Sequence, residues 1–329
     1  MSISLSGCKI FYTKYSMQFV GAFDTVTMIT GYAPSREAFS KSSRLIYDEL
    51  YRYHQLFDIY NEYPDITNLC TVNKNAGKEA TKVPEEIISL LELGLNAYNT
   101  TDGKVNIAMG AVLSLWHTAF DANEKGQSVL PPSMDSLLSA SNHTAISSIQ
   151  INKSDNTVYI TDPNASINVG AIAKGYAVEK TAQYAFSLGY DSYIINAGGN
   201  VRALSAKPNN QGWQVGIDDP FSSDNLMILS LIDCSAVTSG GYNRYFISNG
   251  QKYHHIIDPQ TLQPSDYSAS VTVVCKDSGL ADVLSTALFN MPVQDGLQFV
   301  ENMDGVEACF VQNNGELLLS SGFSSYIKR

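Results

Sequence analysis

Cysteine pairs, zinc-binding spacings and long apolar runs are all missing from this sequence. The five cysteines are scattered, with no Cys-x-x-Cys pair and no Cys/His spacing suited to zinc. A chain of 329 residues that is 44% hydrophobic can bury a large core, so we do not expect a disulfide framework. No apolar run approaches the ~20 residues of a membrane span.

Positive charge is scarce as well. The formal net charge is −11 and Lys and Arg form no cluster, so we expect no nucleic-acid partner. An acidic protein that handles phosphates needs a metal ion or backbone N–H groups to offset their charge. The sequence also has no GxxxxGK[ST], GxGxxG or GxSxG motif. These absences remove the main support for a P-loop nucleotide triphosphatase, a Rossmann dehydrogenase and an α/β-hydrolase.

The N-terminal segment has the form of a lipoprotein processing box. In "LSGC", residues 5–8, the cysteine would be lipidated, although "MSIS" before it supplies neither a basic region nor a full apolar region. The favoured interpretation is a truncated lipoprotein, with a tail over residues 1–16, a lipid anchor at Cys8 and a single domain over 17–329. Such a protein is extracytoplasmic and membrane-anchored. The alternative is a cytoplasmic protein with a stray cysteine.

Hydrophobic periodicity predicts an α+β fold with mixed or antiparallel sheets and packed helices. Residues 17–33 are β-branched and aromatic, which is typical of strand, and "SSIQINKSDNTVYITDP" alternates as a β-hairpin does. Most segments between 190 and 277 are strand-like and separated by Gly, Asn and Asp turns. Helical spacing covers residues 35–60, 84–101, 168–186 and 279–291, and a polar surface excursion covers 120–147.

The stretch "NVGAIAKGYAVEK", residues 168–180, places a lysine where a helix does not favour one. Asn168 is predicted to cap the helix, so Lys174 falls near the first turn, where the helix dipole presents partial positive charge. One interpretation is an exposed lysine on a helix whose small residues allow close packing. The other is that free N–H groups after Gly170 and the Lys174 ammonium converge on one anion, such as a phosphate.

A second candidate site lies in "ADVLSTALF". Asp282 and Thr286 are four residues apart, so both oxygens lie on one helix face. Such oxygens are ligands that Mg²⁺ accepts, completed by water and substrate phosphates. The alternative is structural, because an Asp near a helix start suits the dipole and a mid-helix Thr often bonds to the preceding turn.

Histidines and paired glycines supply further candidates. In "KYHHIIDP", His254 and His255 face opposite ways if the segment is a strand, so at most one of them reaches a given site. The alternative is a structural role, in which a half-buried histidine has its ring nitrogens hydrogen-bonded within the protein. "INAGGN" and "TSGGY" carry paired glycines that allow a ligand to approach the backbone closely, although turns of this kind are common.

Taken together and in order, these stretches resemble the ApbE family of FAD:protein FMN transferases. The resemblance rests on "TNLCTVN", "VGAIAKGYAVEK", "INAGGNVRA", "WQVGIDDP", "VTSGGYNRYF", "YHHIIDP" and "ADVLSTALF", and it extends from about Phe23 to the C-terminus. It implies a T-fold-like α+β core and a Mg²⁺-dependent transfer of FMN from FAD to a threonine or serine hydroxyl of a partner flavoprotein, with release of AMP.

The resemblance also implies roles for particular residues. The metal would be held by the backbone carbonyl of Ala171 and the side chains of Asp282 and Thr286. Residues lining the FAD site would include Lys174 at the phosphates and Phe23 at the flavin. The same site would also include Asn73, Asn106 and His255. The base that accepts the proton of the incoming hydroxyl would be His255 or Asp282, and the unperturbed pKa of histidine lies close to neutral pH.

Three stretches depart from the family pattern. Asn106, in "NIAMGAVL", stands where the family commonly has an Asp that contacts FAD, so a hydrogen bond would remain without the charge. Gly241 stands where an acidic residue is frequent, and "DPQTLQP" replaces a common "DPRTG". We interpret these changes as a subfamily difference, because the lysine, histidine and Asp/Thr positions are intact.

Two other functions compete with flavin transfer. In an FAD pyrophosphatase, water would replace the acceptor hydroxyl in the same site, and the products would be FMN and AMP. In a non-catalytic flavin-binding lipoprotein, FAD would be stored or presented without reaction. Loss of Asp282 or Thr286 would have favoured the non-catalytic protein, but both residues are present.

Overall fold

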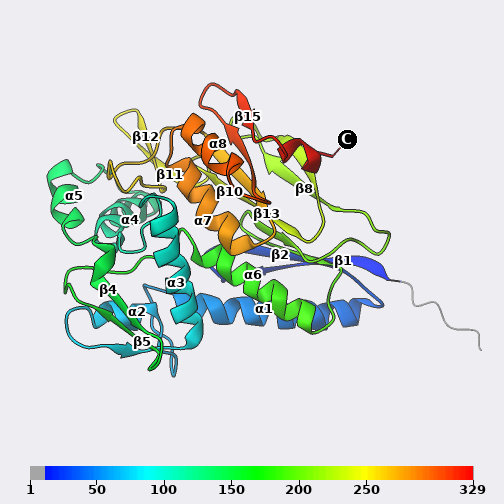
Figure 1. The fold of residues 1–329 in the computed structure, drawn as a ribbon, viewed down its shortest axis with the longest axis horizontal. Coiled ribbons are helices and arrows are strands. Elements are labelled where there is room, and N and C mark those ends of the chain that lie inside the picture. The colour runs from blue at the N-terminus through cyan, green and yellow to red at the C-terminus, as the bar shows by residue number, and fades with distance from the viewer. Residues whose placement is uncertain (1–11, 329) are drawn as a thin grey trace, which may run out of the picture.

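An eight-stranded antiparallel sheet forms the centre of the fold, as the computed structural model of residues 12–328 shows (Figure 1). The strand order is β1-β2-β6-β7-β10-β13-β14-β15, and each adjacent pair is antiparallel. The strands are β1 (Thr13–Val20), β2 (Val26–Ala33), β6 (Tyr193–Ala197), β7 (Asn200–Ala203), β10 (Cys234–Gly240), β13 (Ser270–Cys275), β14 (Glu307–Val311) and β15 (Leu317–Leu319). Every residue of β13 is buried, because both faces of the sheet are covered.

Three helices cover one face of this sheet. They are α1 (Arg36–Phe57), α6 (Ala173–Ser187) and α7 (Ser278–Phe289), with α8 (Val293–Glu301) packed beside α7 and β14. Helix α1 begins at Ser35, whose hydroxyl accepts a hydrogen bond from Ala38 N–H. Its apolar stripe then faces the core. The small face of α6 expected from the sequence is confirmed, since Ala173, Ala177 and Thr181 are all buried.

A hairpin covers the opposite face. Strands β8 (Trp213–Asp218) and β9 (Asn225–Leu231) pair with each other, and the short 3₁₀ segment η2 (Phe323–Tyr326) packs beside them. Trp213, Leu231 and Phe323 form a second apolar cluster with the sheet residues on that side. Burial on both faces explains why the central strands have nearly continuous apolar sequences rather than an alternating pattern.

The remaining elements lie at one end of the large sheet (Figure 1). The three-stranded sheet β3-β5-β4 lies with α2 and α3, while α4, α5 and the β11–β12 hairpin share another apolar cluster. Their bounds are α2 (Leu69–Lys74), β3 (Thr81–Lys82), α3 (Glu85–Thr100), α4 (Gly110–Glu124), α5 (Met134–Ser141), η1 (Ile146–Ser148), β4 (Ile149–Asn152), β5 (Thr157–Ile160), β11 (Tyr245–Ser248) and β12 (Gln251–His254). The predicted hairpin at β4–β5 is confirmed.

Three boundaries differ from the sequence prediction. The expected strand over 17–33 is two strands joined by a turn at 21–25, where Gly21 and two further residues have positive φ. Strand β1 begins at Thr13, so residues 13–16 belong to the sheet and not to a tail. Helix α6 begins at Ala173 rather than near 168, because residues 168–172 form a turn in which the Asn168 side chain accepts from Gly170 N–H.

Cys8, the predicted lipid-anchor position, lies outside the described residues. Over residues 12–328, no helix has both the length and the apolar character needed to cross a membrane.

Candidate functional site

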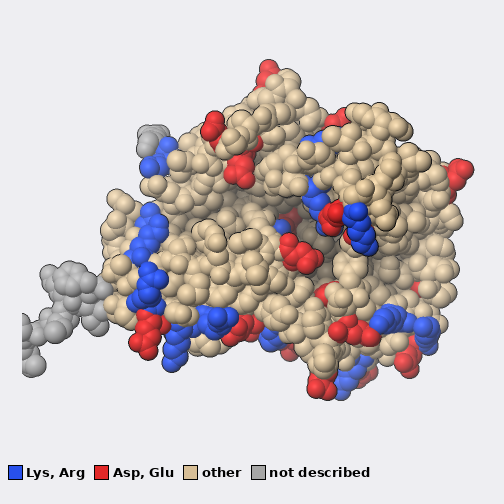
Figure 2. All heavy atoms as spheres, turned by 180° about the vertical axis from the view of Figure 1, so that it is seen from behind, with Lys and Arg blue, Asp and Glu red and all other residues tan. Residues whose placement is uncertain are grey.

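A large cleft of about 850 Å³ lies where the end of the main sheet meets the smaller elements. It is lined by the β1–β2 turn, the C-terminal end of α1, the loop before α6, the β6–β7 turn, β10 and α7. Figure 2 shows the molecule from behind, where the surface is hollowed near its centre and charged side chains of both signs border the hollow. Almost all the predicted site residues line this cleft, namely Phe23, Asn106, Ala171, Lys174, His255, Asp282 and Thr286.

Lys174 is the second residue of α6, as expected for a lysine in the first turn. Its ammonium donates to the carbonyl of Gly198 in the β6–β7 turn, over 3.3 Å. Within residues 12–328, Lys174 forms no ion pair. The lysine therefore brings a positive charge to the cleft without an opposite charge in contact.

Asp282 is the buried acid of the cleft, with 6% of its surface exposed. Its Oδ2 accepts a hydrogen bond of 2.7 Å from Gly175 N–H, which joins α7 to the start of α6. A Cβ added to Gly175 would lie 2.3 Å from Asp282 Cβ and 2.4 Å from the Ser278 carbonyl. Only glycine permits this approach. Burial raises the pKa of the Asp282 carboxyl, and the nearby Lys174 charge opposes that rise.

Neutral oxygens surround this carboxylate. Thr286 follows Asp282 by one helical turn, and its hydroxyl lies 3.5 Å from that of Ser239 on β10. Ser239 and Ser285 also share a hydrogen bond of 2.9 Å. Ala171, in the turn before α6, lines the same cleft. The i, i+4 prediction is confirmed in that both Asp282 and Thr286 reach one cavity.

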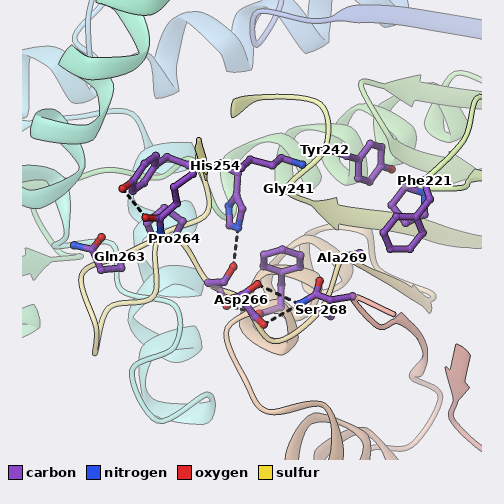
Figure 3. A pocket seen from close by; sticks show the side chains of 16 residues that line it. Phe221, Gly241, Tyr242, His254, Gln263, Pro264, Asp266, Ser268 and Ala269 are labelled. Carbon is purple, nitrogen blue, oxygen red and sulfur yellow. Dashed lines mark hydrogen bonds between the residues drawn. The ribbon is translucent and has the colours of Figure 1, made fainter. Parts of the chain in front are cut away.

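The adjacent histidines lie in different cavities. His254 ends β12 and lines a smaller pocket of about 430 Å³, drawn in Figure 3. There its Nε2 donates to the Ser265 carbonyl at 2.7 Å and its Nδ1 accepts from Ile256 N–H. His254 is thus a buried histidine whose two ring nitrogens are both hydrogen-bonded within the protein. His255 lines the large cleft, so the prediction that only one of the two reaches a given site is confirmed.

The position of the ring proton of His255 follows from its hydrogen bond to the Arg244 carbonyl. Its Nδ1 lies 3.3 Å from the Arg244 carbonyl, and a carbonyl can only accept, so the proton is assigned to Nδ1 and Nε2 keeps a lone pair. The ring is exposed to solvent in the cleft, and the neighbouring parts of the chain displace some of the water around it. This desolvation lowers the pKa of His255 to about 4, and the positive charges of Arg244 and Lys174 act in the same direction. His255 is therefore neutral at pH 7.

Phe23 lies in the β1–β2 turn and lines the cleft, with its backbone N–H donating to His54 Nδ1 at 3.2 Å. Other aromatic side chains line the cleft as well. Tyr60 stacks on His117 at a centroid distance of 4.7 Å, and Trp116 and Phe120 come from the same helix as His117. The cleft thus offers an aromatic lining in addition to the charged residues.

Asn106 and Asn73 hold loops in place. Asn106 lines the cleft, but its amide donates to the Thr144 carbonyl and its oxygen accepts from Ala108 N–H. Asn73 does not line the cleft. Its amide forms a reciprocal pair with the backbone of Ile167, donating to the carbonyl at 2.9 Å and accepting from the N–H at 2.8 Å. We therefore correct its expected place in the lining: it anchors the loop that leads to Ala171.

Sequence reasoning missed three polar residues of the cleft. Lys104 is 9% exposed and contacts Asp258 at 3.4 Å, and His54 and Asp58 come from the end of α1. The signal available for Lys104 was a lysine followed by an apolar segment, which is common in surface loops. His54 and Asp58 had the spacing of an ordinary helix end, so no pattern distinguished them.

These features define a class before any relative is considered. The chain is an α+β protein whose cleft combines an aromatic lining, a free cation and a buried carboxylate among neutral oxygens, a set suited to an aromatic ligand with phosphates. A sequence profile described as the ApbE family matches residues 13–310. The chain belongs to the ApbE family.

Curated relatives and solved structures agree with this assignment. The chain is 30% identical over 280 residues to a protein of Treponema pallidum and 29% identical over 277 residues to one of Klebsiella pneumoniae, both named FAD:protein FMN transferase. The matches cover 80% and 81% of this chain and 76% and 84% of the relatives. The crystal structure of an ApbE protein from Thermotoga maritima, 28% identical, superposes with a TM-score of 0.86 over 96% of this chain and 100% of that chain. The α+β fold expected from the sequence is confirmed.

Proposed function

We propose that this chain transfers FMN from FAD to a threonine or serine hydroxyl of a partner flavoprotein, and that AMP is released. The convergence of Lys174, Asp282, Thr286 and His255 on one cleft supports this proposal most strongly. These residues come from α6, α7 and the end of the β11–β12 hairpin, so only the folded chain brings them together. The curated relatives carry the name of the same reaction.

The donor set fits a bound Mg²⁺. Within residues 12–328, no three His, Cys, Asp or Glu side chains gather as a metal site, so an ion here would have at most two such ligands. Mg²⁺ is commonly held in this way, by one or two carboxylates with other oxygens and substrate phosphates. The buried Asp282 carboxylate makes no ion pair within 4 Å among the described residues. A bound cation would offset the free-energy cost of burying this charge. Asp282, Thr286 and the Ala171 carbonyl would hold the ion, which neutralises phosphate charge when bound.

Lys174 would bind the pyrophosphate. Displacement at phosphorus depends mainly on charge neutralisation and placement of the reacting groups. In the reaction, the acceptor oxygen forms a bond to the phosphorus of the FMN half. The bond from that phosphorus to the bridging oxygen breaks, and AMP leaves with that oxygen. The ammonium of Lys174 supplies positive charge at this end of the cleft.

His255 is the better candidate for the base. Its Nε2 keeps a lone pair, whereas one oxygen of Asp282 already accepts from Gly175 N–H and the carboxylate would hold the metal. The acceptor hydroxyl would give its proton to His255 Nε2 as the oxygen attacks. The low pKa of His255 leaves the ring unprotonated at pH 7, although it also makes the ring a weak base until negative phosphates bind nearby.

Hydrolysis is the second candidate function. Water in place of the acceptor hydroxyl would give FMN and AMP in the same cleft, with the same residues. The cleft is open to solvent at His255, which favours entry of either nucleophile.

A defined reaction separates transfer from hydrolysis. The protein is incubated with FAD and Mg²⁺, with and without a candidate acceptor flavoprotein, and the acceptor is examined by mass spectrometry for an added FMN. Added FMN that requires Mg²⁺ and disappears with an acceptor lacking the target hydroxyl supports transfer. Equal amounts of free FMN with and without acceptor, and no modified acceptor, would favour hydrolysis.

We further propose that Cys8 carries a lipid anchor and that the protein works outside the cytoplasm at a membrane. The support is the "LSGC" pattern alone. Metabolic labelling of the full-length protein with a fatty acid should mark the unmodified chain and not Cys8→Ser. Equal labelling of both, or of neither, would favour the cytoplasmic alternative.

A further inference from the structure

The β1–β2 turn at the cleft has an unfavourable backbone conformation. Phe23 and Asp24 have φ of +53° and +50°, in the left-handed region that residues with a Cβ seldom adopt. Phe23, Asp24 and Thr25 all line the cleft. Such a conformation persists only where neighbouring groups hold it in place, and positions of this kind often serve a ligand.

The His54 side chain bonds to the middle of this turn. Phe23 N–H donates to His54 Nδ1 at 3.2 Å, and the Phe23 ring meets the His54 ring edge-on, with 5.5 Å between centroids and 69° between planes. His54 lies in the last turn of α1, which packs against β1, β2 and α6. The turn is therefore tied to α1 by two side chains, by His54 at Phe23 and by Tyr47, whose hydroxyl donates to the Val20 carbonyl at the start of the turn.

His54 is in turn oriented by two further side chains. Its Nε2 lies 3.3 Å from Tyr63 Oη, and the Tyr63 hydroxyl donates to Asp58 Oδ2 at 2.8 Å. Asp58 is 8% exposed, and its other oxygen accepts from the N–H groups of Tyr60 and Asn61. Every member of this chain of hydrogen bonds thus has a partner.

The direction of the chain is determined by its ends. The Phe23 amide can only donate, so His54 Nδ1 must present a lone pair and the ring proton lies on Nε2. Nε2–H then donates to the Tyr63 oxygen, and the Tyr63 proton goes to the Asp58 carboxylate. If His54 were protonated, its Nδ1–H would point at the Phe23 N–H, and the hydrogen bond between them would be lost.

The turn also contacts the phosphate end of the cleft. A Cβ added to Gly198, which has φ of +55°, would lie 2.2 Å from Thr25 Oγ1. The carbonyl of the same Gly198 accepts from Lys174 Nζ. The β1–β2 turn, called the Phe23 turn below, therefore contacts the β6–β7 turn, and the β6–β7 turn is bonded to Lys174. These contacts set the position of Phe23 relative to the lysine.

We propose that His54, oriented by Tyr63 and Asp58, is a positioning residue that holds the Phe23 turn against the flavin ring of FAD. The identity of the ligand rests on the proposed function. Phe23 supplies the aromatic surface, and His54 acts through it without touching the reacting atoms. FAD has two aromatic ends, and the placement of the flavin rather than the adenine at Phe23 is the one that the family resemblance implies.

Equilibrium binding of FAD, FMN and ADP tests this assignment, because FMN carries only the flavin and ADP only the adenine. In His54→Ala, the affinity for FAD and FMN should fall about fivefold to tenfold, the effect of one lost hydrogen bond, while ADP binding stays within about twofold. His54→Asn places an oxygen near the position of Nδ1 and should restore most of the loss. Tyr63→Phe should show the same ligand pattern with a smaller effect.

Tyr193→Phe is the matched control for Tyr63→Phe. It removes a buried hydroxyl that bonds to Ser42 on the same helix, at 2.6 Å, and Tyr193 does not line the cleft. Its binding of all three ligands should match that of the unmodified chain, even where its melting temperature falls as much as that of Tyr63→Phe. Equal losses for FMN and ADP, or a loss in Tyr193→Phe of the same pattern, would overturn the positioning role.

Different results would exclude the role of His54 and the flavin transfer on which it rests. Unchanged FMN affinity in His54→Ala, with tight binding by the unmodified chain, overturns the role of His54 and leaves flavin transfer in place. Failure of the unmodified chain to bind FAD at all overturns both. Selective loss of flavin binding supports the role of His54 even where an acceptor receives no FMN.

Discussion

Two cavities share the side chain of Tyr242, and they differ in how their polar groups are satisfied. In the smaller pocket, His254 uses both ring nitrogens on the backbone, and Asp266 accepts from the Asn313 amide (Figure 3). In the large cleft, His255 has only Nδ1 bonded and the buried Asp282 carboxylate has no ion pair, as far as residues 12–328 are concerned. The clearest difference lies in the histidines, because both ring nitrogens of His254 are bonded within residues 12–328 and only Nδ1 of His255 is.

The largest expected effect comes from removing the buried carboxylate. Asp282→Ala should reduce Mg²⁺-dependent FMN transfer by more than about 10³-fold, because without the metal ligand the phosphate charge is no longer neutralised. The rate of acceptor modification measures this, with circular dichroism to confirm the fold. Asp266→Ala, in the smaller pocket, is the control and should transfer at the normal rate. Normal turnover in Asp282→Ala would refute the metal assignment.

The two histidines should respond in opposite ways. His255→Ala should lower kcat by about 10²- to 10³-fold with little change in stability, as expected for loss of a general base. His254→Ala should instead destabilise the fold by about 1–3 kcal/mol, because the Ser265 carbonyl and Ile256 N–H lose their partner. Single-turnover kinetics and chemical denaturation measure the two effects. A kcat that is lost in His254→Ala and kept in His255→Ala would reverse the assignment.

A smaller effect is expected at the free lysine. Lys174→Ala should weaken FAD binding about 10- to 100-fold, the effect of a lost hydrogen bond to a charged group. Lys252→Ala is the matched control, since Lys252 lines the smaller pocket and is exposed. Isothermal titration with FAD measures both. The same affinity in Lys174→Ala as in the unmodified chain would exclude contact with the phosphates.

The smallest effect is a shift along the pH axis. Desolvation lowers the pKa of His255 to about 4, so the base is unprotonated above that pH and becomes protonated as the pH falls through it. The acid limb of kcat/KM, which reports the free enzyme, should therefore lie well below pH 6.5. His255→Ala should lack this limb. A limb at or above pH 6.5 in the unmodified chain would show that another group is titrating.

Local pattern was enough to place several site residues in advance. The i, i+4 spacing put Asp282 and Thr286 on one face, and the expectation that only one of two adjacent histidines reaches a given site held, although His255 lies just past the end of β12. The family resemblance then indicated which residues share a site. Its limit was Asn73, which bonds to the backbone of Ile167 outside the cleft lining. The same polar side chain can line a cavity or support the loop behind it, and sequence does not separate the two.

Local spacing along the chain determined the elements themselves: the apolar stripe of α1, the β4–β5 hairpin and the small face of α6 are short-range patterns with short-range causes. Tertiary structure alone decided the burial of Asp282, the free nitrogen of His255 and the strained turn held by His54. The physical reason is that solvation and hydrogen-bond partners are set by groups distant in sequence. Gly175 illustrates this, since its lack of a side chain matters only because α7 passes 107 residues later.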